Sequence, residues 1–316
     1  MNAQHDLDAD PFETERARLQ GLAYRMLGSV ADAQDVVQEA WLRWARLGDD
    51  GRAQVLHPAA WLTTCASRLA LDKLKSAQRQ REEYIGPWLP EPILTDGDPA
   101  VAAELAESLT IGFLAVLERL GPVERAVFLL ADVFAEPYSV IAPVVGCSEE
   151  ACRQIASRAR QRVRQERQLF HPAAARRDQL LHAFMAACAF GQIDDLRRVL
   201  SDDVVLVSDG GREVHAARRP VLGIPRVGRL LTTLTKRVPA DVQIALHEVN
   251  GEPGLVFTRD GVVTLVMVFE VWRDRIAAIR IMLNPAKLAG VQAVVRGQEV
   301  SQAGGRSRSP TGRTEG

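Results

Sequence analysis

The sequence has little that would mark an exported, membrane-spanning or metal-binding protein. Its 316 residues include four cysteines, Cys65, Cys147, Cys152 and Cys188, which form no CxxC pair and no cluster with histidine. We therefore expect small packing residues in a reducing compartment, with no metal and no cofactor. Apolar runs such as Val262 to Phe269 are far shorter than the ~20 residues that span a bilayer. Because the N-terminal segment is polar and acidic rather than a signal peptide, we expect a cytoplasmic protein without membrane contact.

The chain also lacks an excess of charge of either sign. Its formal net charge is −1, so any binding of nucleic acid must come from local basic patches. With 47% hydrophobic and 25% charged residues, the composition is that of an ordinary globular protein. The length favours two or three domains.

Hydrophobic periodicity and chain breakers divide the sequence into five parts. The first and third have helical periodicity, and a proline-rich connector separates them. The fourth has two helices followed by strand-like runs, with hairpin turns expected at Arg259–Gly261 and Arg273–Arg275. The last is rich in glycine, serine and arginine and is expected to be disordered. The expected boundaries are 11–85, 86–107, 108–168, 172–290 and 291–316.

The helix expected around "CRQIASRARQRVRQER" is amphipathic. Its packing face is expected at Ala151, Ile155, Ala159 and Val163, with arginines on the opposite side. A short helix and a glycine-containing turn precede it, as in a helix-turn-helix that reads DNA. The pattern leaves open a plain solvated face. The arginines of the stripe are Arg153, Arg160, Arg164 and Arg167.

A second charged feature lies near the N-terminus. Asp32, Asp35 and Glu39 fall on one side of a helix, away from its packing face. Acidic side chains there would repel phosphate, so they indicate a protein-docking surface, or else a solvated face. The basic run Lys73, Lys75, Arg79 and Arg81 lies at the far end of the same block, where it could contact DNA. The tryptophans Trp41, Trp44 and Trp61 are expected in the core.

These motifs together resemble a known family. "DAQDVVQEAWLRW" resembles region 2 of bacterial sigma factors of the extracytoplasmic-function (ECF) group. "LERLGPVERAVFLLADVF" with "CRQIASRARQRV" resembles region 4, which reads the −35 promoter element. The resemblance implies two all-α sigma domains that bind promoter DNA and the β′ clamp and β flap of core RNA polymerase.

The resemblance also implies residue roles. Polymerase contact would fall on Asp32, Asp35, Gln38 and Glu39. The −10 element would be captured by a loop at about Ser76 to Tyr84, with Lys75, Arg79 and Arg81. The −35 bases would lie nearest Arg153, Gln154, Ser157 and Arg158, whereas the arginine stripe favours Arg153, Arg160 and Arg164.

Three further motifs, "WLPEP", "SDGGREV" and "NPAKL", resemble a subgroup called ECF41, or the SigJ type. That subgroup carries a C-terminal α+β SnoaL-like cone of the NTF2 fold. The sequence departs from the subgroup pattern at Arg212, Glu213 and Ala286. The implied interdomain regulatory residues are Trp88, Leu89, Pro90, Asp209, Gly210, Gly211, Asn284, Pro285 and Leu288.

The apolar connector predicts a contact with this cone. Trp88 and Leu89 are costly to leave in water, and the prolines around them lower the entropy lost on docking. We expect "GPWLPEP" to pack near Asp209 to Val214 and to hold the two sigma domains together. The alternative is that Trp88 packs on its own helices.

The cone also raises a rival interpretation, because related folds include isomerases and cyclases. Asp209, His215, His247 and Glu270 are the candidate acid–base groups. They show no spacing that signals shared work, and a fold does not imply chemistry. We expect no catalytic residues, while a DNA-binding protein whose cone senses a small ligand, or retains such an activity, is the alternative.

Overall fold

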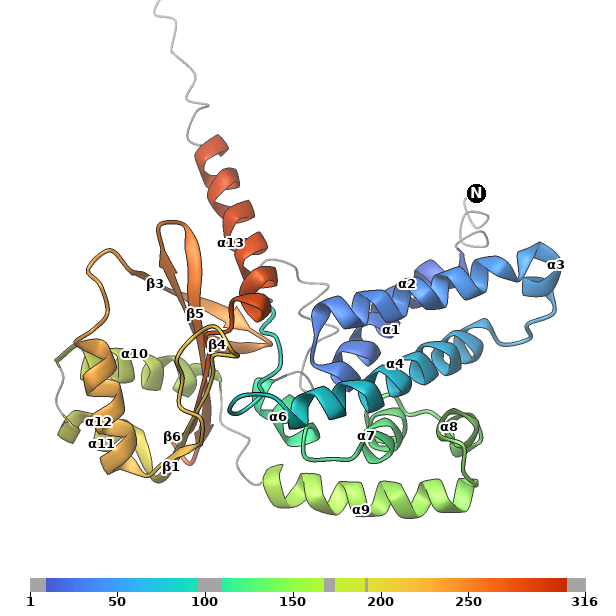
Figure 1. Ribbon diagram of the computed structural model, residues 1–316, viewed down its shortest axis with the longest axis horizontal. Coiled ribbons are helices and arrows are strands. Elements are labelled where there is room, and N and C mark those ends of the chain that lie inside the picture. Colours follow the sequence, from blue (N-terminus) through green and yellow to red (C-terminus); the bar gives the residue numbers. More distant parts are fainter. Residues whose placement is uncertain (1–9, 96–109, 168–173, 191–192, 306–316) are drawn as a thin grey trace, which may run out of the picture.

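The computed structural model describes residues 10–95, 110–167, 174–190 and 193–305. It has a helical part and a sheet-containing part, which lie side by side with the linker between them (Figure 1). Among the described residues, no helix is long and apolar enough to cross a bilayer.

The N-terminal helices are bounded by residues typical of caps. Asp10 accepts a hydrogen bond from the Phe12 amide and caps α1, while Gly28 ends α1 with φ 66°. Val36, Ala40 and Trp44, at helical spacing on one face of α2, are buried, whereas Leu47 is only partly buried. The helices are α1 (Pro11–Leu27), α2 (Val30–Arg46), α3 (Gly48–Ala53) and α4 (Pro58–Glu82).

The second helical block contains the expected helix-turn-helix. Gly146 ends α8 with φ 76°, and Pro143 is accommodated inside that helix. The buried face of α9 is Cys152, Ala156, Ala159 and Val163, so it is displaced slightly from the expected one. The elements are α6 (Ile111–Leu117), α7 (Pro122–Phe128), the π-helical turn η1 (Leu129–Val133), α8 (Tyr138–Val145) and α9 (Glu149–Arg167).

The two helical blocks share one hydrophobic core rather than forming separate bodies. Arg125 of α7, only 2% exposed, donates to the Met26 carbonyl of α1 at 2.9 Å and to Glu118 at 2.6 Å. Arg68 of α4 donates to the Pro143 carbonyl at 2.9 Å. The described structure is therefore a closed arrangement of the two blocks.

The C-terminal domain is a six-stranded sheet in the order β2-β1-β6-β5-β4-β3, with β1 and β6 parallel. The two expected hairpin turns are confirmed, with positive φ at Asp260 and Gly261 and at Arg273 and Asp274. The sequence did not reveal α12 and β2. The elements are α10 (Ala174–Phe190), α11 (Ile193–Val199), β1 (Leu200–Asp209), β2 (Val221–Leu222), α12 (Ile224–Thr235), β3 (Gln243–Val249), β4 (Glu252–Arg259), β5 (Val262–Trp272) and β6 (Arg275–Met282).

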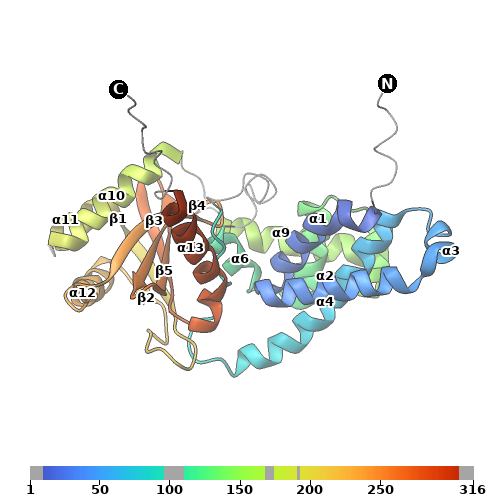
Figure 2. The same cartoon turned by 90° about the horizontal axis from the view of Figure 1, so that it is seen from above.

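Both faces of this sheet are covered. The helices α10, α11 and α12 pack on one face and form a cone with it, while α13 (Pro285–Gly305) and the linker lie on the other (Figure 2). The expectation of disorder from residue 291 was wrong up to residue 305. Leu288 and Val291 bury one side of α13, and alanine and glutamine extend it. Residues 306–316 lie outside the described part.

Candidate functional site

A buried carboxylate joins the linker to the C-terminal domain. Asp209, at the end of β1, is 1% exposed. Its Oδ1 accepts a hydrogen bond from the Tyr84 hydroxyl at 2.5 Å and from the Gly211 amide at 3.1 Å. Its Oδ2 accepts from the Leu89 amide at 2.8 Å. The segment that follows α4, residues 83–95, is the linker in the structure. It therefore supplies two of the donors to a charge that water does not reach.

Lys287 of α13 closes the same site. Its Nζ lies 2.6 Å from Asp209 Oδ2, donates to the Leu89 carbonyl, and sits 3.9 Å from the centre of the Trp88 ring. Asn284 donates to the Tyr84 hydroxyl at 2.9 Å. We call Tyr84, Trp88, Leu89, Asp209, Asn284 and Lys287 the linker clasp.

The phenol of Tyr84 stays protonated in this setting. Burial raises the pKa of Tyr84, and the neighbouring Asp209 carboxylate raises it further. The hydroxyl can therefore donate to Asp209 and accept from Asn284 at the same time.

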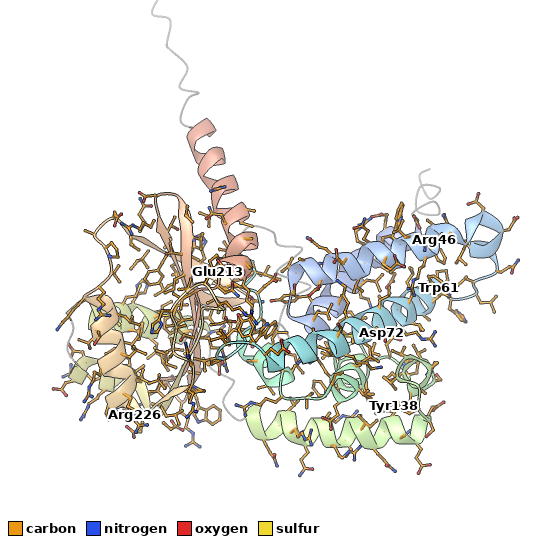
Figure 3. The ribbon with its side chains drawn as sticks, viewed as in Figure 1. Arg46, Trp61, Asp72, Tyr138, Glu213 and Arg226 are labelled. Carbon is orange, nitrogen blue, oxygen red and sulfur yellow. The ribbon has the colours of Figure 1, made fainter. Side chains whose placement is uncertain are left out.

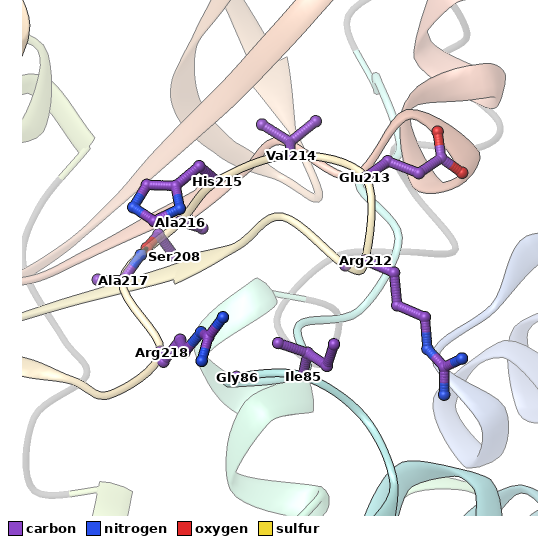
Figure 4. Close-up of a pocket in the computed structure, with 11 residues that line it drawn as sticks. Ile85, Gly86, Ser208, Arg212, Glu213, Val214, His215, Ala216, Ala217 and Arg218 are labelled. Atoms are coloured by element: carbon purple, nitrogen blue, oxygen red, sulfur yellow. Dashed lines mark hydrogen bonds between the residues drawn. The ribbon is translucent and has the colours of Figure 1, made fainter.

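Gly211, after Asp209, allows a close approach of Asn284, which directly precedes α13, and not of the linker. Gly211 has φ 60°, and a Cβ there would lie 2.7 Å from Asn284 Nδ2. The departures from the subgroup pattern, Arg212, Glu213 and Ala286, are all exposed. Glu213 is labelled in Figure 3, and Figure 4 shows its loop beside Ile85 and Gly86 of the linker.

Trp88 contacts both its own helices and the C-terminal domain, which the sequence analysis gave as alternatives. Its ring packs on the turn between α1 and α2, where a Cβ at Gly28 would lie 2.5 Å from Trp88 Cη2. The other contact is with Lys287 of the C-terminal domain. The tryptophan thus lies between the first sigma block and the cone.

A second junction, which sequence reasoning missed, lies at Asn250. Its backbone amide donates to the Ile93 carbonyl at 2.8 Å, and its Oδ1 accepts from the Ile93 amide at 2.9 Å. Its Nδ2 donates to the hydroxyl of Tyr24 in α1 at 3.0 Å. The Tyr24 hydroxyl in turn donates to the Glu91 carbonyl at 2.5 Å. The signal was the dipeptide Asn-Gly at 250–251, a strong hairpin indicator.

The linker behaves as an extra strand. Its amides at 89, 91, 93 and 95 all donate, to Asp209, Gly28, Asn250 and Glu248. This period of two is that of an extended chain, and Leu94 forms an antiparallel bridge with Val249 of the edge strand β3. The non-donating prolines fall between the donors. The linker thereby covers part of an otherwise open sheet edge.

The negative charge on the acidic face of α2 is partly neutralised by a lysine of the neighbouring helix α4. Lys73 of α4 donates to Asp32 at 2.8 Å and to Asp35 at 2.9 Å. Burial opposes its charge, but the two carboxylates raise the pKa of Lys73 overall. Glu39 pairs with Arg43 at 2.9 Å, and Gln38 is exposed.

Trp41 corrects the expected core. It is 40% exposed, whereas Trp44 is buried at 1%. The helix places Trp41 one turn from Gln38, beside the acidic residues, because its position falls outside the buried stripe.

The expected −10 loop from Ser76 is wrong as a conformation, because α4 continues to Glu82. Alanine, glutamine, arginine and glutamate in this stretch all favour helix. Lys75 is exposed, while the side chains of Arg79 and Arg81 lie outside the described ones.

The arginines of α9 differ in whether they anchor the helix or remain exposed. Arg160 donates to Asp132 at 2.6 Å and to the Tyr138 hydroxyl at 3.2 Å, so it anchors α9 to η1 and α8. Arg153 pairs with Glu149 at 2.9 Å but remains 56% exposed in its side chain. The other exposed candidates are Gln154, Ser157, Arg158 and Arg164.

The candidate acid–base groups of the cone do not meet. A cavity of about 1020 Å³ lies between the sheet and the helices α10 and α12, and of the four candidates only His215 lines it. Asp209 belongs to the linker clasp, Glu270 pairs with Arg280, and His247 lies on the edge strand. The described residues also contain no group of three or more side chains that could hold a metal.

Comparison with known proteins decides the family. Residues 12–80 match sigma-70 region 2 and residues 112–163 match sigma-70 region 4. The ECF RNA polymerase sigma factor SigJ of Mycobacterium tuberculosis is 42% identical over 257 residues, which cover 78% of this chain and 80% of SigJ. This chain belongs to the ECF RNA polymerase sigma factors. The probable ECF RNA polymerase sigma factor SigI of the same organism is 32% identical over 300 residues, which cover 93% of this chain and 99% of SigI.

The structure agrees with this assignment. A crystal structure of M. tuberculosis SigJ superposes with a TM-score of 0.72 at 37% identity, covering 88% of this chain and 97% of that one. The sigma factor binds core RNA polymerase and promoter DNA and directs the initiation of transcription. Its C-terminal domain is the expected SnoaL-like cone of the NTF2 fold.

Proposed function

We propose that the linker clasp regulates this sigma factor by holding its two DNA-binding blocks in the closed arrangement. A sigma factor on polymerase must let these blocks separate to span the −10 and −35 elements. The observation that carries the proposal is the bonding of Asp209, a buried carboxylate shared by the linker and α13. Opening the linker removes two donors from this charge and leaves Lys287 as its ion-pair partner.

The energetic scale suits a switch rather than a permanent lock. Hydrogen bonds to a charged group contribute roughly 1.5–3 kcal/mol each, and the side chain of Leu89 contributes about 1.5–3 kcal/mol by burial. Binding to polymerase and promoter DNA can exceed a sum of this size. The closed form then predominates in the free protein and is displaced on assembly.

We also propose roles for the exposed charged surfaces. The face of α2 with Asp32, Asp35, Gln38 and Glu39 docks on core polymerase, supported by exposed Trp41, since aromatic side chains anchor interfaces. The exposed arginines of α9 contact the −35 duplex. The basic end of α4, with Lys75, Arg79 and Arg81, approaches the −10 element as a helix.

The proposal assigns no catalytic activity to the cone. No Asp or Glu is among the described residues that line its cavity, so the pair of carboxyl groups expected for proton transfer is missing there. The protein acts in the cytoplasm, where it assembles with polymerase.

Run-off transcription at limiting core polymerase tests the regulatory role. Asp209→Asn keeps the shape of the side chain but removes its charge, so it should release the linker and raise transcript yield severalfold. Glu213→Gln, an exposed change four residues away, is the matched control and should leave the yield unchanged. Equal yields from the wild type and Asp209→Asn would show that the clasp does not limit assembly.

A further inference from the structure

The cone contains a large hollow with no assigned occupant. Its volume of about 1020 Å³ lies at the upper end of the range of ligand pockets, roughly 300–1,000 Å³. Side chains of α10, α12 and the sheet line it, including Phe184, Leu231, Phe257 and Met267. A cavity already open in the folded domain needs no rearrangement to accept a molecule.

The lining determines what chemistry fits. Nearly all of it is hydrocarbon, and its charged or titratable members among the described residues are Arg237, His215 and Cys188. Burial raises the pKa of Cys188 to about 12, so that thiol stays neutral. Without a carboxylate in the wall, a cationic ligand would lose its hydration and gain no counter-charge. A neutral apolar molecule has no charge to dehydrate, and a single anionic group could pair with Arg237.

The cavity shares part of its wall with a smaller hollow that faces the linker. Val214, Ala216 and Ala217 line the large cavity on one side and a hollow of about 270 Å³ against Ile85 and Gly86 on the other (Figure 4). The Ala217 amide donates to Ser208 of β1, next to Asp209, at 2.9 Å.

The helix α13 provides a second connection. Pro285 and Leu288 line the cavity, and Asn284 and Lys287 of the same turn hold Tyr84 and Asp209. A bound molecule would thus touch the turn of α13 that carries two clasp residues, and also the loop that follows Asp209.

We propose that the cone binds a largely hydrocarbon molecule, neutral or with one anionic group, and that its binding stabilises the linker clasp. The second half rests on the proposed function of the clasp, whereas the binding site does not. A ligand that fits the cavity of the closed form favours that form by RT ln(1 + [L]/Kd). At 100 times Kd, the clasped state gains about 100-fold over a form that cannot bind.

A fluorescent fatty-acid probe tests the site in the full-length protein. We expect 11-(dansylamino)undecanoic acid to bind saturably with a blue-shifted emission. Dodecanoate and dodecanol, kept below their micelle concentrations, should displace it, whereas dodecylammonium should be at least tenfold weaker. Absence of saturable binding, or equal displacement by the ammonium, would overturn the assignment.

Two substitutions locate the probe. Leu234→Trp fills the mouth of the cavity and should weaken binding at least tenfold. Leu222→Trp is the matched control, because Leu222 is also exposed but lies outside the lining. Equal binding by both variants would place the probe elsewhere.

Chymotrypsin cleavage after Tyr84 or Trp88, identified by mass spectrometry, tests the coupling. Saturating dodecanoate should slow this cleavage at least threefold in the wild type and have no effect in Leu234→Trp. An unchanged or faster rate in the wild type would overturn the coupling while leaving the binding site intact. Because these readouts need no polymerase, their failure is distinct from a failure of the run-off test.

Discussion

Asp209 shows how much a single side chain can hold together. Four donors reach its carboxylate, two from the linker, one from its own turn and one from α13. Removing one partner of such a buried pair costs more than the pair itself contributes, because the remaining charge stays buried. This asymmetry makes the site sensitive to the loss of any member.

Glu252 supplies a prediction on pH dependence. Burial, followed by repulsion from Glu270, raises the pKa of Glu252 to about 7. Because the folded pKa lies above the unfolded one, this group's stabilising contribution is full below about pH 4.5 and is lost as the pH rises through 7. At about 1.4 kcal/mol per pKa unit, the upper bound is roughly 3 kcal/mol.

Urea unfolding from pH 5 to pH 8 measures this effect. The wild type should lose stability over that range relative to Glu252→Gln, which does not titrate. Asp194→Asn, at a side chain that is 89% exposed, should parallel the wild type. Parallel curves for the wild type and Glu252→Gln would refute the shift.

The arginines of α9 differ in what their loss should do. Arg153 is both on the stripe and among the residues that the family places nearest the bases. Arg153→Ala should cost ~1–3 kcal/mol on the preferred −35 sequence and relax one base position. Arg164→Ala should weaken all sequences alike and reduce the salt dependence.

Holoenzyme binding to promoters varied one base at a time distinguishes these outcomes. Arg226→Ala on α12 is the matched control, an exposed arginine on the C-terminal domain (Figure 3). Equal, sequence-independent losses for Arg153 and Arg164 would make α9 a phosphate clamp only.

At the scale of the element, the acidic face of α2 yields a docking prediction. Asp35→Arg with Glu39→Arg should abolish capture of core polymerase, since it reverses two charges on the proposed contact face. The double variant Asp49→Arg and Asp50→Arg on α3 changes the charge equally at exposed positions and should bind normally. Retained capture by the first variant would show that α2 is not the docking helix.

The elements were foreseeable where local periodicity decides them. The buried face of α2 and the hairpins of the cone follow from patterns within single segments, and the buried face of α9 was predicted to within one residue. The −10 segment was misjudged because the family resemblance was given more weight than its helix-forming composition. Trp41 was misjudged because residue type was given more weight than its position on the helix.

The junction residues could not be found in the same way. Lys287 meets Leu89 across 198 positions, Asn250 meets Ile93 across 157, and Arg125 meets Met26 across 99. No local pattern encodes which distant backbone group will approach a given side chain. What the sequence did indicate was that the apolar linker needed a partner, and the motif at Asp209 indicated where.

At the scale of the whole molecule, closure rests on two kinds of contact. The two sigma blocks share a core directly, and the linker joins both of them to the cone. Two aromatic residues link the first sigma block to the C-terminal domain. Tyr24 of α1 accepts a hydrogen bond from Asn250, and Trp88 contacts both Gly28 and Lys287. Under the proposed function, opening the blocks also requires release of the linker, so the clasp would bias the whole equilibrium.

Amide hydrogen exchange of the linker tests this claim most directly. Peptides covering residues 85–95 should exchange slowly in the free protein, at least tenfold faster in Asp209→Asn, and unchanged in Glu213→Gln. Addition of core polymerase to the wild type should accelerate the same peptides. Unprotected linker amides in the free protein, or equal protection in the holoenzyme, would contradict a clasp that opens on assembly.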